Sequence, residues 1–195
     1  LEQHDIKEVS DLVYETDPTV CGIFYGKNKE KALSRLEKFI REDNNSLSYK
    51  NIHVAEKDGR IAGILILFPG EGFDKKREGE LYFQIMGWTY LFKILLYIPL
   101  FRGVLTDTFH PKEIYINNLS VHSDFRGQGV GTAFLQYAIQ LAKQDKATRL
   151  ILDVSLSNPA AQRLYERIGF SVYDTKSHRI LGTVVGTNKM ELRLT

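Results

Sequence analysis

The sequence predicts one domain of the α/β class (mixed α+β), in which a mixed, largely antiparallel and twisted sheet carries helices on both faces. Its 195 residues suit a single domain over 1–195. Apolar residues recur at helical spacing in some segments and alternate in others. Segments of strand type lie at both ends of a strand–helix–strand–helix middle, and this order implies a mixed sheet covered by helices.

The first half of the chain is expected to contribute two helices and a hairpin. The helices each show one apolar face, and Asp58 and Gly59 form a strong turn signal between two apolar runs. The expected elements are helices at 5–15 and 29–41 and strands at 52–56 and 61–68.

The second half is expected to supply the rest of the sheet. Its last helix has clear start and stop signals. Asn158 suits the N-cap, Pro159 suits the first helical position, and Gly169 suits the position just past the end. The expected elements are helices at 131–143 and 158–168 and strands at 113–121, 150–155, 170–173 and 189–194.

An apolar helical insertion is expected at about 69–112. Its segment 81–105 carries only Lys93 and Arg102 as charges and is long enough to span a bilayer. Polar and glycine interruptions together with helical spacing favour a buried helix pair and no membrane span. A lid over a binding site, a dimer face and a membrane-surface helix stay open as alternatives.

The composition argues against several classes of function. Lys plus Arg number 26 and Asp plus Glu 24, so the net charge of +2 gives no reason to expect nucleic-acid binding. Cys21 is the single cysteine, which excludes an intrachain disulfide and favours a cytoplasmic setting. The five histidines lack ligand-like spacing, so no metal site is expected. The chain begins at Leu1 without a methionine or signal-peptide pattern, and a trimmed first strand is therefore one expectation.

A glycine-rich segment between a strand and a strong helix is the first candidate site. Glycines let backbone N–H groups approach a ligand, and the helix start adds a positive dipole end, so a pyrophosphate suits this place. The dinucleotide pattern GxGxxG fails at its last glycine, and a plain tight connection is the alternative reading. The residues of this segment are Arg126, Gly127, Gln128, Gly129, Val130, Gly131 and Thr132.

Three blocks together resemble the GNAT superfamily of N-acetyltransferases. Arg126, Gly129 and Gly131 occupy the positions of its signature, which is Arg or Gln, two variable residues, Gly, one variable residue, and Gly or Ala. Residues 115–121 resemble the family's central strand, and residues 152–170 resemble its second cofactor motif. The resemblance covers about 55 residues, from 115 to 170, and the order of the blocks makes it far more specific than the glycines alone.

The resemblance implies acetyl-CoA as cosubstrate. Main-chain groups of Leu119, Ser120 and Val121 would pair with the pantetheine arm like an added strand. Amides from Gln128 to Thr132 would hold the pyrophosphate. Asn158 would contact the cofactor at the start of its helix, a role that is compatible with capping that helix.

Tyr165 is the candidate general acid. Its hydroxyl is protonated at neutral pH and can protonate the departing coenzyme A thiolate. The spacing alone favours an aromatic residue packed in the core, and the match to the family's Leu-Tyr position favours catalysis. A backbone N–H near Val121 would polarise the thioester carbonyl.

Asp153 is one candidate for the general base. Strand alternation places it on the face opposite Leu152 and Val154, and burial would raise its pKa toward the useful range. A structural carboxylate is an equal alternative, and the side chain is shorter than the Glu that some relatives use. Asn117 and Asn118 can orient a water or the acceptor, and His122 is a second proton carrier that can equally be a solvated loop residue.

The predicted function is acetyl transfer from acetyl-CoA to a primary amine by direct attack, since Cys21 lacks the context of a nucleophile. The alternatives are a non-catalytic acyl-CoA sensor and an interaction module that uses the insertion. The acceptor cannot be chosen from the resemblance, and a homodimer stays open. The aromatic residues expected to line the acceptor pocket are Tyr82, Phe83, Trp88 and Tyr90.

Overall fold

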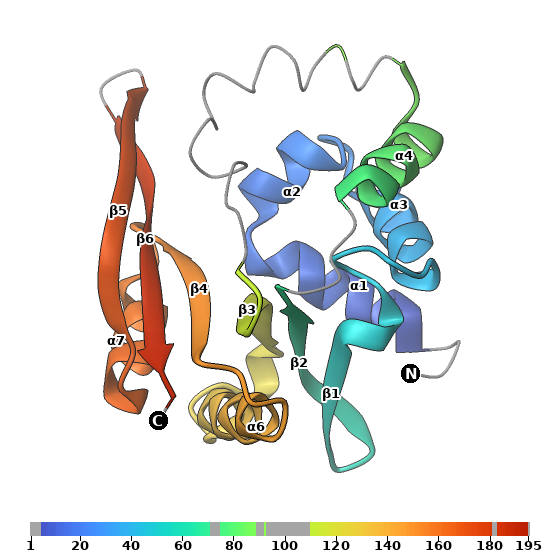
Figure 1. Cartoon of the computed structure of the whole chain (residues 1–195). Coiled ribbons are helices and arrows are strands. Elements are labelled where there is room, and N and C mark those ends of the chain that lie inside the picture. Colours follow the sequence, from blue (N-terminus) through green and yellow to red (C-terminus); the bar gives the residue numbers. More distant parts are fainter. Residues whose placement is uncertain (1–4, 71–74, 89–91, 93–109, 181–182, 195) are drawn as a thin grey trace.

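A computed structural model describes residues 5–70, 75–88, 92, 110–180 and 183–194. These residues form one six-stranded sheet in the order β1-β2-β3-β4-β6-β5, with helices on both faces (Figure 1). Only β3 and β4 pair in parallel, and the other neighbours are antiparallel, which confirms the predicted fold class. The strands are β1 (Ile52–Lys57), β2 (Arg60–Pro69), β3 (Glu113–Val121), β4 (Arg149–Ser155), β5 (Ser171–Ile180) and β6 (Thr183–Arg193). The helices are α1 (Asp5–Thr16), α2 (Pro18–Phe24), α3 (Lys29–Arg41), α4 (Lys75–Met86), α6 (Val130–Gln144) and α7 (Pro159–Ile168), with short 3-10 turns at Tyr49–Asn51 and Ser123–Phe125.

Strand β2 divides the core into two halves because its side chains are buried on both faces. Ile64 and Ile66 join the cluster formed with α1 to α4. Leu65 and Leu67 join the cluster formed with α6 and α7. A central strand that is apolar throughout therefore anchors helices on both sides of the sheet.

The turn signal at residues 58–59 and the cap signals of α7 have the backbone geometry that the sequence predicts. Asp58 and Gly59 have φ angles of 54° and 71°, the two positive values that a type I′ hairpin needs. The side chain of Asn158 accepts from the N–H of Ala161 at 3.1 Å, and Gly169 ends the helix at φ 109°. These signals fix the β1–β2 turn and both ends of α7.

Two features differ from the sequence-based expectations. Helix α2 was not expected, although Asp17 caps it and Pro18 is its first residue. Strands β5 and β6 are longer than expected because their pairing continues from Asp174 with Lys189 to Ile180 with Thr183. Of the insertion, the structure describes α4, and most of segment 81–105 lies outside the described residues. No helix among the described residues is long and apolar enough to cross a bilayer.

Strands β3 and β4 diverge near the middle of the sheet. Their parallel pairing ends at Ile116 with Leu152. Strand β3 nevertheless continues to Val121 and β4 to Ser155. The two strands therefore open a gap in the sheet, flanked by the ends that carry the candidate site residues.

Candidate active site

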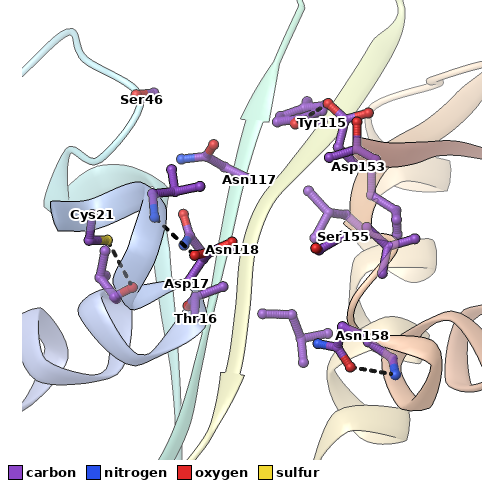
Figure 2. A pocket seen from close by; sticks show the side chains of 18 of the residues that line it. Thr16, Asp17, Cys21, Ser46, Tyr115, Asn117, Asn118, Asp153, Ser155 and Asn158 are labelled. Carbon is purple, nitrogen blue, oxygen red and sulfur yellow. Dashed lines mark hydrogen bonds between the residues drawn. The ribbon is translucent and has the colours of Figure 1, made fainter. Parts of the chain in front are cut away.

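A cavity of about 390 Å³ lies at the gap between β3 and β4. Figure 2 shows one side of it built from α1 and α2 and the other from β4 and α7. Among the predicted site residues, those whose side chains or main chain line it are Asn117, Asn118, Leu119, Asp153, Asn158 and Tyr165. Residues far apart in the sequence thus meet in one volume that is large enough for a small ligand.

The edge of β3 presents main-chain donors to the gap. The N–H of His122 donates to the carbonyl of Ala62 on β2 at 2.9 Å. Peptide groups alternate along a strand, so the N–H groups of Leu119 and Val121 point away from β2 and into the gap. By the same alternation, the main-chain N–H and C=O groups of Ser120 point toward β2. This direction disfavours the expected pairing of Ser120 with the pantetheine arm.

Arg126 fixes the end of that strand. Its Nε donates to the carbonyl oxygen of Val121 at 3.0 Å. The carbonyl of Val121 is therefore occupied, while its N–H still faces the gap. Arg126, the signature arginine, therefore holds the end of β3 in place, and it does not line the described cavity.

The glycine segment leads into α6 with its first turn uncapped by any side chain. Gly127 and Gly129 have φ angles of 74° and 85°, a region that residues with a Cβ rarely adopt. Gly129 is the N-cap of α6 and provides no side-chain hydrogen bond. The N–H groups of Val130, Gly131 and Thr132 therefore stay available at the positive end of the helix, as anion binding requires.

Gly131 brings this helix start against the gap. A Cβ there would lie 3.1 Å from Leu164 on α7 and 3.8 and 3.9 Å from the side chains of Val121 and Leu119. The helix start, the end of β3 and α7 therefore meet where only a glycine fits without displacement.

Lys57 is a residue that the sequence reasoning missed. Its Nζ donates to the side-chain oxygen of Gln128 at 2.6 Å, and the Gln128 amide donates to the carbonyl of Asp124 at 2.8 Å. The β1–β2 hairpin thus places a cation beside the glycine segment. Nothing in the local pattern of Lys57 signals this, because the contact joins residues 71 apart in the sequence.

Tyr165 points from α7 into the cavity wall. Only 8% of the residue is exposed, and burial raises the pKa of its hydroxyl to about 12. Its ring packs 6.0 Å from that of Phe170. Tyr165 is therefore both a core aromatic and a hydroxyl that stays protonated across the neutral pH range.

Asp153 faces the cavity from β4 and has a partner that the sequence reasoning did not identify. The hydroxyl of Tyr115 donates to its Oδ2 at 3.0 Å. Burial raises the pKa of Asp153 above its ordinary value, and the hydrogen bond from Tyr115 opposes that rise. Leu152 and Val154 point to the opposite face, as the alternation predicts. Burial also raises the pKa of Tyr115, so Tyr115 stays the donor.

The remaining predicted site residues are His122 and the four aromatic residues expected around the acceptor. The side chain of His122 caps the turn before the glycine segment by accepting from the N–H of Asp124 at 3.3 Å, outside the described cavity lining. Of the four aromatic residues expected around the acceptor, Tyr82 lines the cavity. Phe83 packs edge-to-face against Trp88, which is 77% exposed, and Tyr90 lies outside the described residues.

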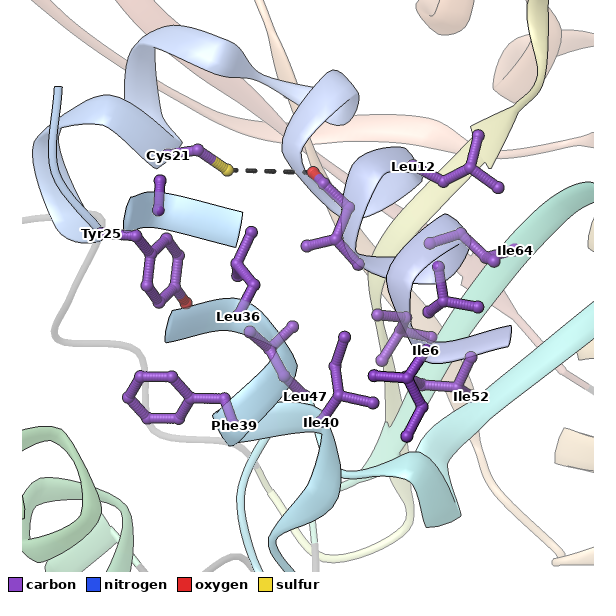
Figure 3. Close-up of a cluster of buried hydrophobic side chains, with 14 of the residues drawn as sticks. Ile6, Leu12, Cys21, Tyr25, Leu36, Phe39, Ile40, Leu47, Ile52 and Ile64 are labelled. Carbon is purple, nitrogen blue, oxygen red and sulfur yellow. Dashed lines mark hydrogen bonds between the residues drawn. The ribbon is translucent and has the colours of Figure 1, made fainter. Parts of the chain in front are cut away.

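The wall opposite β4 comes from α1 and α2. Thr16, Asp17, Cys21 and Phe24 line the cavity there, and Figure 2 shows the first three on the α1–α2 side. Figure 3 shows Cys21 at the edge of the buried cluster that fixes these helices to β1 and β2. The Asp17–Pro18 pair was a sequence signal for a helix start here.

Cys21 is a poor nucleophile in this setting. Its side chain is buried, its Sγ lies 3.8 Å from the carbonyl of Val13, and burial raises the pKa of the thiol to about 12. Asp153 and Tyr165 are therefore the candidates for proton transfer in this cavity, and Cys21 supplies no thiolate to carry an acyl group. No group of three or more potential metal ligands occurs among the described residues.

Comparisons with known proteins agree with this architecture. Residues 14–170 match the model of the acetyltransferase (GNAT) family. An N-alpha-acetyltransferase 30 of Schizosaccharomyces pombe is 36% identical over 59 residues, which cover 30% of this chain and 39% of that protein. The chain matches less than half of the length of the first curated relatives.

Two solved structures share the fold along nearly the whole chain. An N-acetyltransferase from Staphylococcus aureus has a TM-score of 0.66 at 20% identity, with 96% of each chain covered. A protein from Salmonella typhimurium, solved with its cofactor acetyl-CoA, has a TM-score of 0.57 at 13% identity, with 100% of this chain and 91% of that chain covered. The family model spans most of the sequence, and the chain therefore belongs to the acetyltransferase (GNAT) family.

Proposed function

We propose that this chain is an N-acetyltransferase that moves an acetyl group from acetyl-CoA to a primary amine. One observation carries the proposal: the uncapped start of α6 packs against Leu119 at the end of β3, and Leu119 lines the cavity that holds both Asp153 and Tyr165. The first feature suits a pyrophosphate, and the second suits proton transfer on both sides of a reacting bond. The neighbour with the same fold that was solved with acetyl-CoA supports the choice of donor.

The donor would lie along the open edge of β3. The N–H groups of Leu119 and Val121 face the gap, so a pantetheine amide can pair with them as an added strand does. The diphosphate would rest on the N–H groups of Val130 to Thr132, with Lys57 beside it. This arrangement would direct the thioester past the N–H of Val121, which does not line the described cavity but can polarise the carbonyl at its entrance to the gap.

The reaction would move two protons off the nitrogen and one onto the sulfur, with no covalent enzyme intermediate. Asp153 takes a proton from the ammonium group of the acceptor, directly or through a water. The free amine attacks the carbonyl carbon, the C–N bond forms, and the C–S bond breaks with its electron pair on sulfur. The nitrogen loses its second proton to a water, Tyr165 donates its proton to the leaving thiolate, and the tyrosinate takes one back from solvent. Cys21 takes no part, because its thiol stays protonated.

Thiol release and product mass, measured together with acetyl-CoA and an amine library, test the proposal. Asp153→Asn and Tyr165→Phe are each expected to lower kcat by about 10²–10⁴-fold, the usual contribution of a general base or acid. Asp145→Asn and Tyr137→Phe are the matched controls, because both residues are exposed and neither lines the described cavity. Acetyl-CoA binding without turnover of any amine would overturn the enzyme and favour an acyl-CoA sensor.

A further inference from the structure

The charge of the cavity is one-sided. Among the described lining residues, Asp17 and Asp153 are the charged ones, and none is lysine, arginine or histidine. Figure 2 shows Asp17 on the side built by α1 and α2 and Asp153 on the side of β4. Two carboxylates in a described lining that includes no basic side chain raise the local affinity for positive charge, although Lys176 acts on Asp153 from outside that lining.

Asp17 has a structural task that leaves its charge available. Its Oδ1 accepts from the N–H of Val20 at 2.9 Å and caps α2. A neutral asparagine does the same work elsewhere in the chain, since Asn28 caps α3 by accepting from the N–H of Lys31 at 2.9 Å. Capping therefore needs only the side-chain oxygen, and the negative charge of Asp17, although favourable at a helix start, is also available to a ligand in the cavity.

The two carboxylates cannot serve the same amine throughout the reaction. In the proposed function, Asp153 neutralises the attacking amine by taking its proton. Asp17 is a second, half-buried carboxylate in the same lining, and it attracts a positive group that persists through the reaction. An acceptor with two amines supplies both, because one loses its proton to Asp153 while the other stays an ammonium opposite Asp17.

We propose that Asp17 binds a second, permanent positive charge on the acceptor, and that the acceptor is a small diamine. This inference rests on the proposed acetyl transfer. The bound dication and the two carboxylates sum to zero charge, whereas a zwitterionic amino acid would place its carboxylate against one of theirs. The rings of Phe24, Tyr25 and Tyr82 in the same lining suit an ammonium group and an alkyl chain. The volume of about 390 Å³ favours a small molecule over a peptide.

Three acceptors with the same number of carbon atoms separate the effect of the charge at the second end of the acceptor from the effect of its length. They are α,ω-diaminobutane, butylamine and γ-aminobutyrate, which present a second positive, neutral and negative end. For the wild type, kcat/KM is expected to be at least about tenfold higher for the diamine than for butylamine, since a charge-assisted hydrogen bond contributes about that factor. The zwitterion is expected to be the poorest acceptor.

Asp17→Asn keeps an oxygen for the α2 cap and removes the charge. The ratio of kcat/KM for diamine over butylamine is expected to fall toward one in this variant, while Asp145→Asn preserves the ratio of the wild type. An unchanged melting temperature would confirm that α2 is still capped. An equal preference in the wild type, or a ratio that Asp17→Asn leaves intact, would overturn the role of Asp17.

Calorimetry separates this inference from the proposed function. The diamine is titrated into wild-type protein and into Asp17→Asn, each saturated with coenzyme A. Binding to the wild type that weakens about tenfold in the variant supports the inference even if no amine is acetylated. Turnover of amines without charge selectivity supports the enzyme and refutes the diamine. Absence of diamine binding together with absence of turnover would refute both.

Discussion

Replacing Tyr115 by phenylalanine is expected to shift the pH dependence of acetyl transfer to higher pH. Burial raises the pKa of Asp153, the hydroxyl of Tyr115 lowers it, and Lys176 and Asp174 act on it with opposite signs. A hydrogen bond to a charged group contributes about 1.5–3 kcal/mol, and one pH unit corresponds to about 1.4 kcal/mol. Loss of the 3.0 Å bond should therefore raise the pKa of Asp153, because the ionised carboxylate loses this stabilisation.

The sign follows from the role of the carboxylate. A base must be ionised, so a higher pKa of Asp153 moves the acid limb of kcat to higher pH and leaves the plateau in place. The assay is thiol release under saturating substrates across the acid limb, in wild type and in Tyr115→Phe. Tyr137→Phe removes an exposed hydroxyl outside the described cavity lining and is the control. An unmoved limb, or one displaced to lower pH, would refute the pairing of Tyr115 with the catalytic base.

Two further predictions concern the packing of β2 beside β3 and the place of Lys57 in the cofactor site. In Gly63→Ala the new Cβ would lie 2.5 Å from the carbonyl oxygen of Ser120, so overpacking is expected to lower the free energy of unfolding by about 1–3 kcal/mol in denaturant titrations. Gly79→Ala, exposed in α4 with nothing within 4 Å of the new Cβ, should raise that free energy by about 0.5–1 kcal/mol, and equal effects of the two changes would contradict the packing of β2 on β3. Lys57→Met is expected to raise the KM for acetyl-CoA about two- to fivefold, and the difference should fade in high salt because the contact is exposed. A KM that is the same at low salt would remove Lys57 from the cofactor site.

The sequence predicts the parts of the fold that local chemistry decides. Asp58 and Gly59 form the hairpin turn, and Asn158 and Gly169 bound α7, because caps and positive φ angles depend on residues close in sequence. The glycine segment likewise meets an uncapped helix start. The family resemblance is confirmed by the match over residues 14–170.

The acceptor side of the cavity could not be predicted in the same way. Asp17 joins the cavity lining because α1 and α2 pack near β3 and β4, which are far from it in the sequence. Tyr115 contacts Asp153, 38 positions later, because β3 and β4 lie side by side in the sheet. The family resemblance indicates Asp153 and strand alternation indicates its face, yet neither reveals which neighbour it contacts. The same limit explains Lys57, whose contact with Gln128 depends on the reach of the hairpin.

The measurement that tests the account most directly is thermal unfolding with and without acetyl-CoA, followed by thiol release in the same sample on addition of an amine. A ligand that binds only the native state at about 100 times its Kd adds about 2.7 kcal/mol to stability. For a domain of this size, that corresponds to a rise of about 5–10 °C in the melting temperature. We predict this rise together with thiol release, whereas an unchanged melting temperature at saturating acetyl-CoA would contradict the site between β3 and β4.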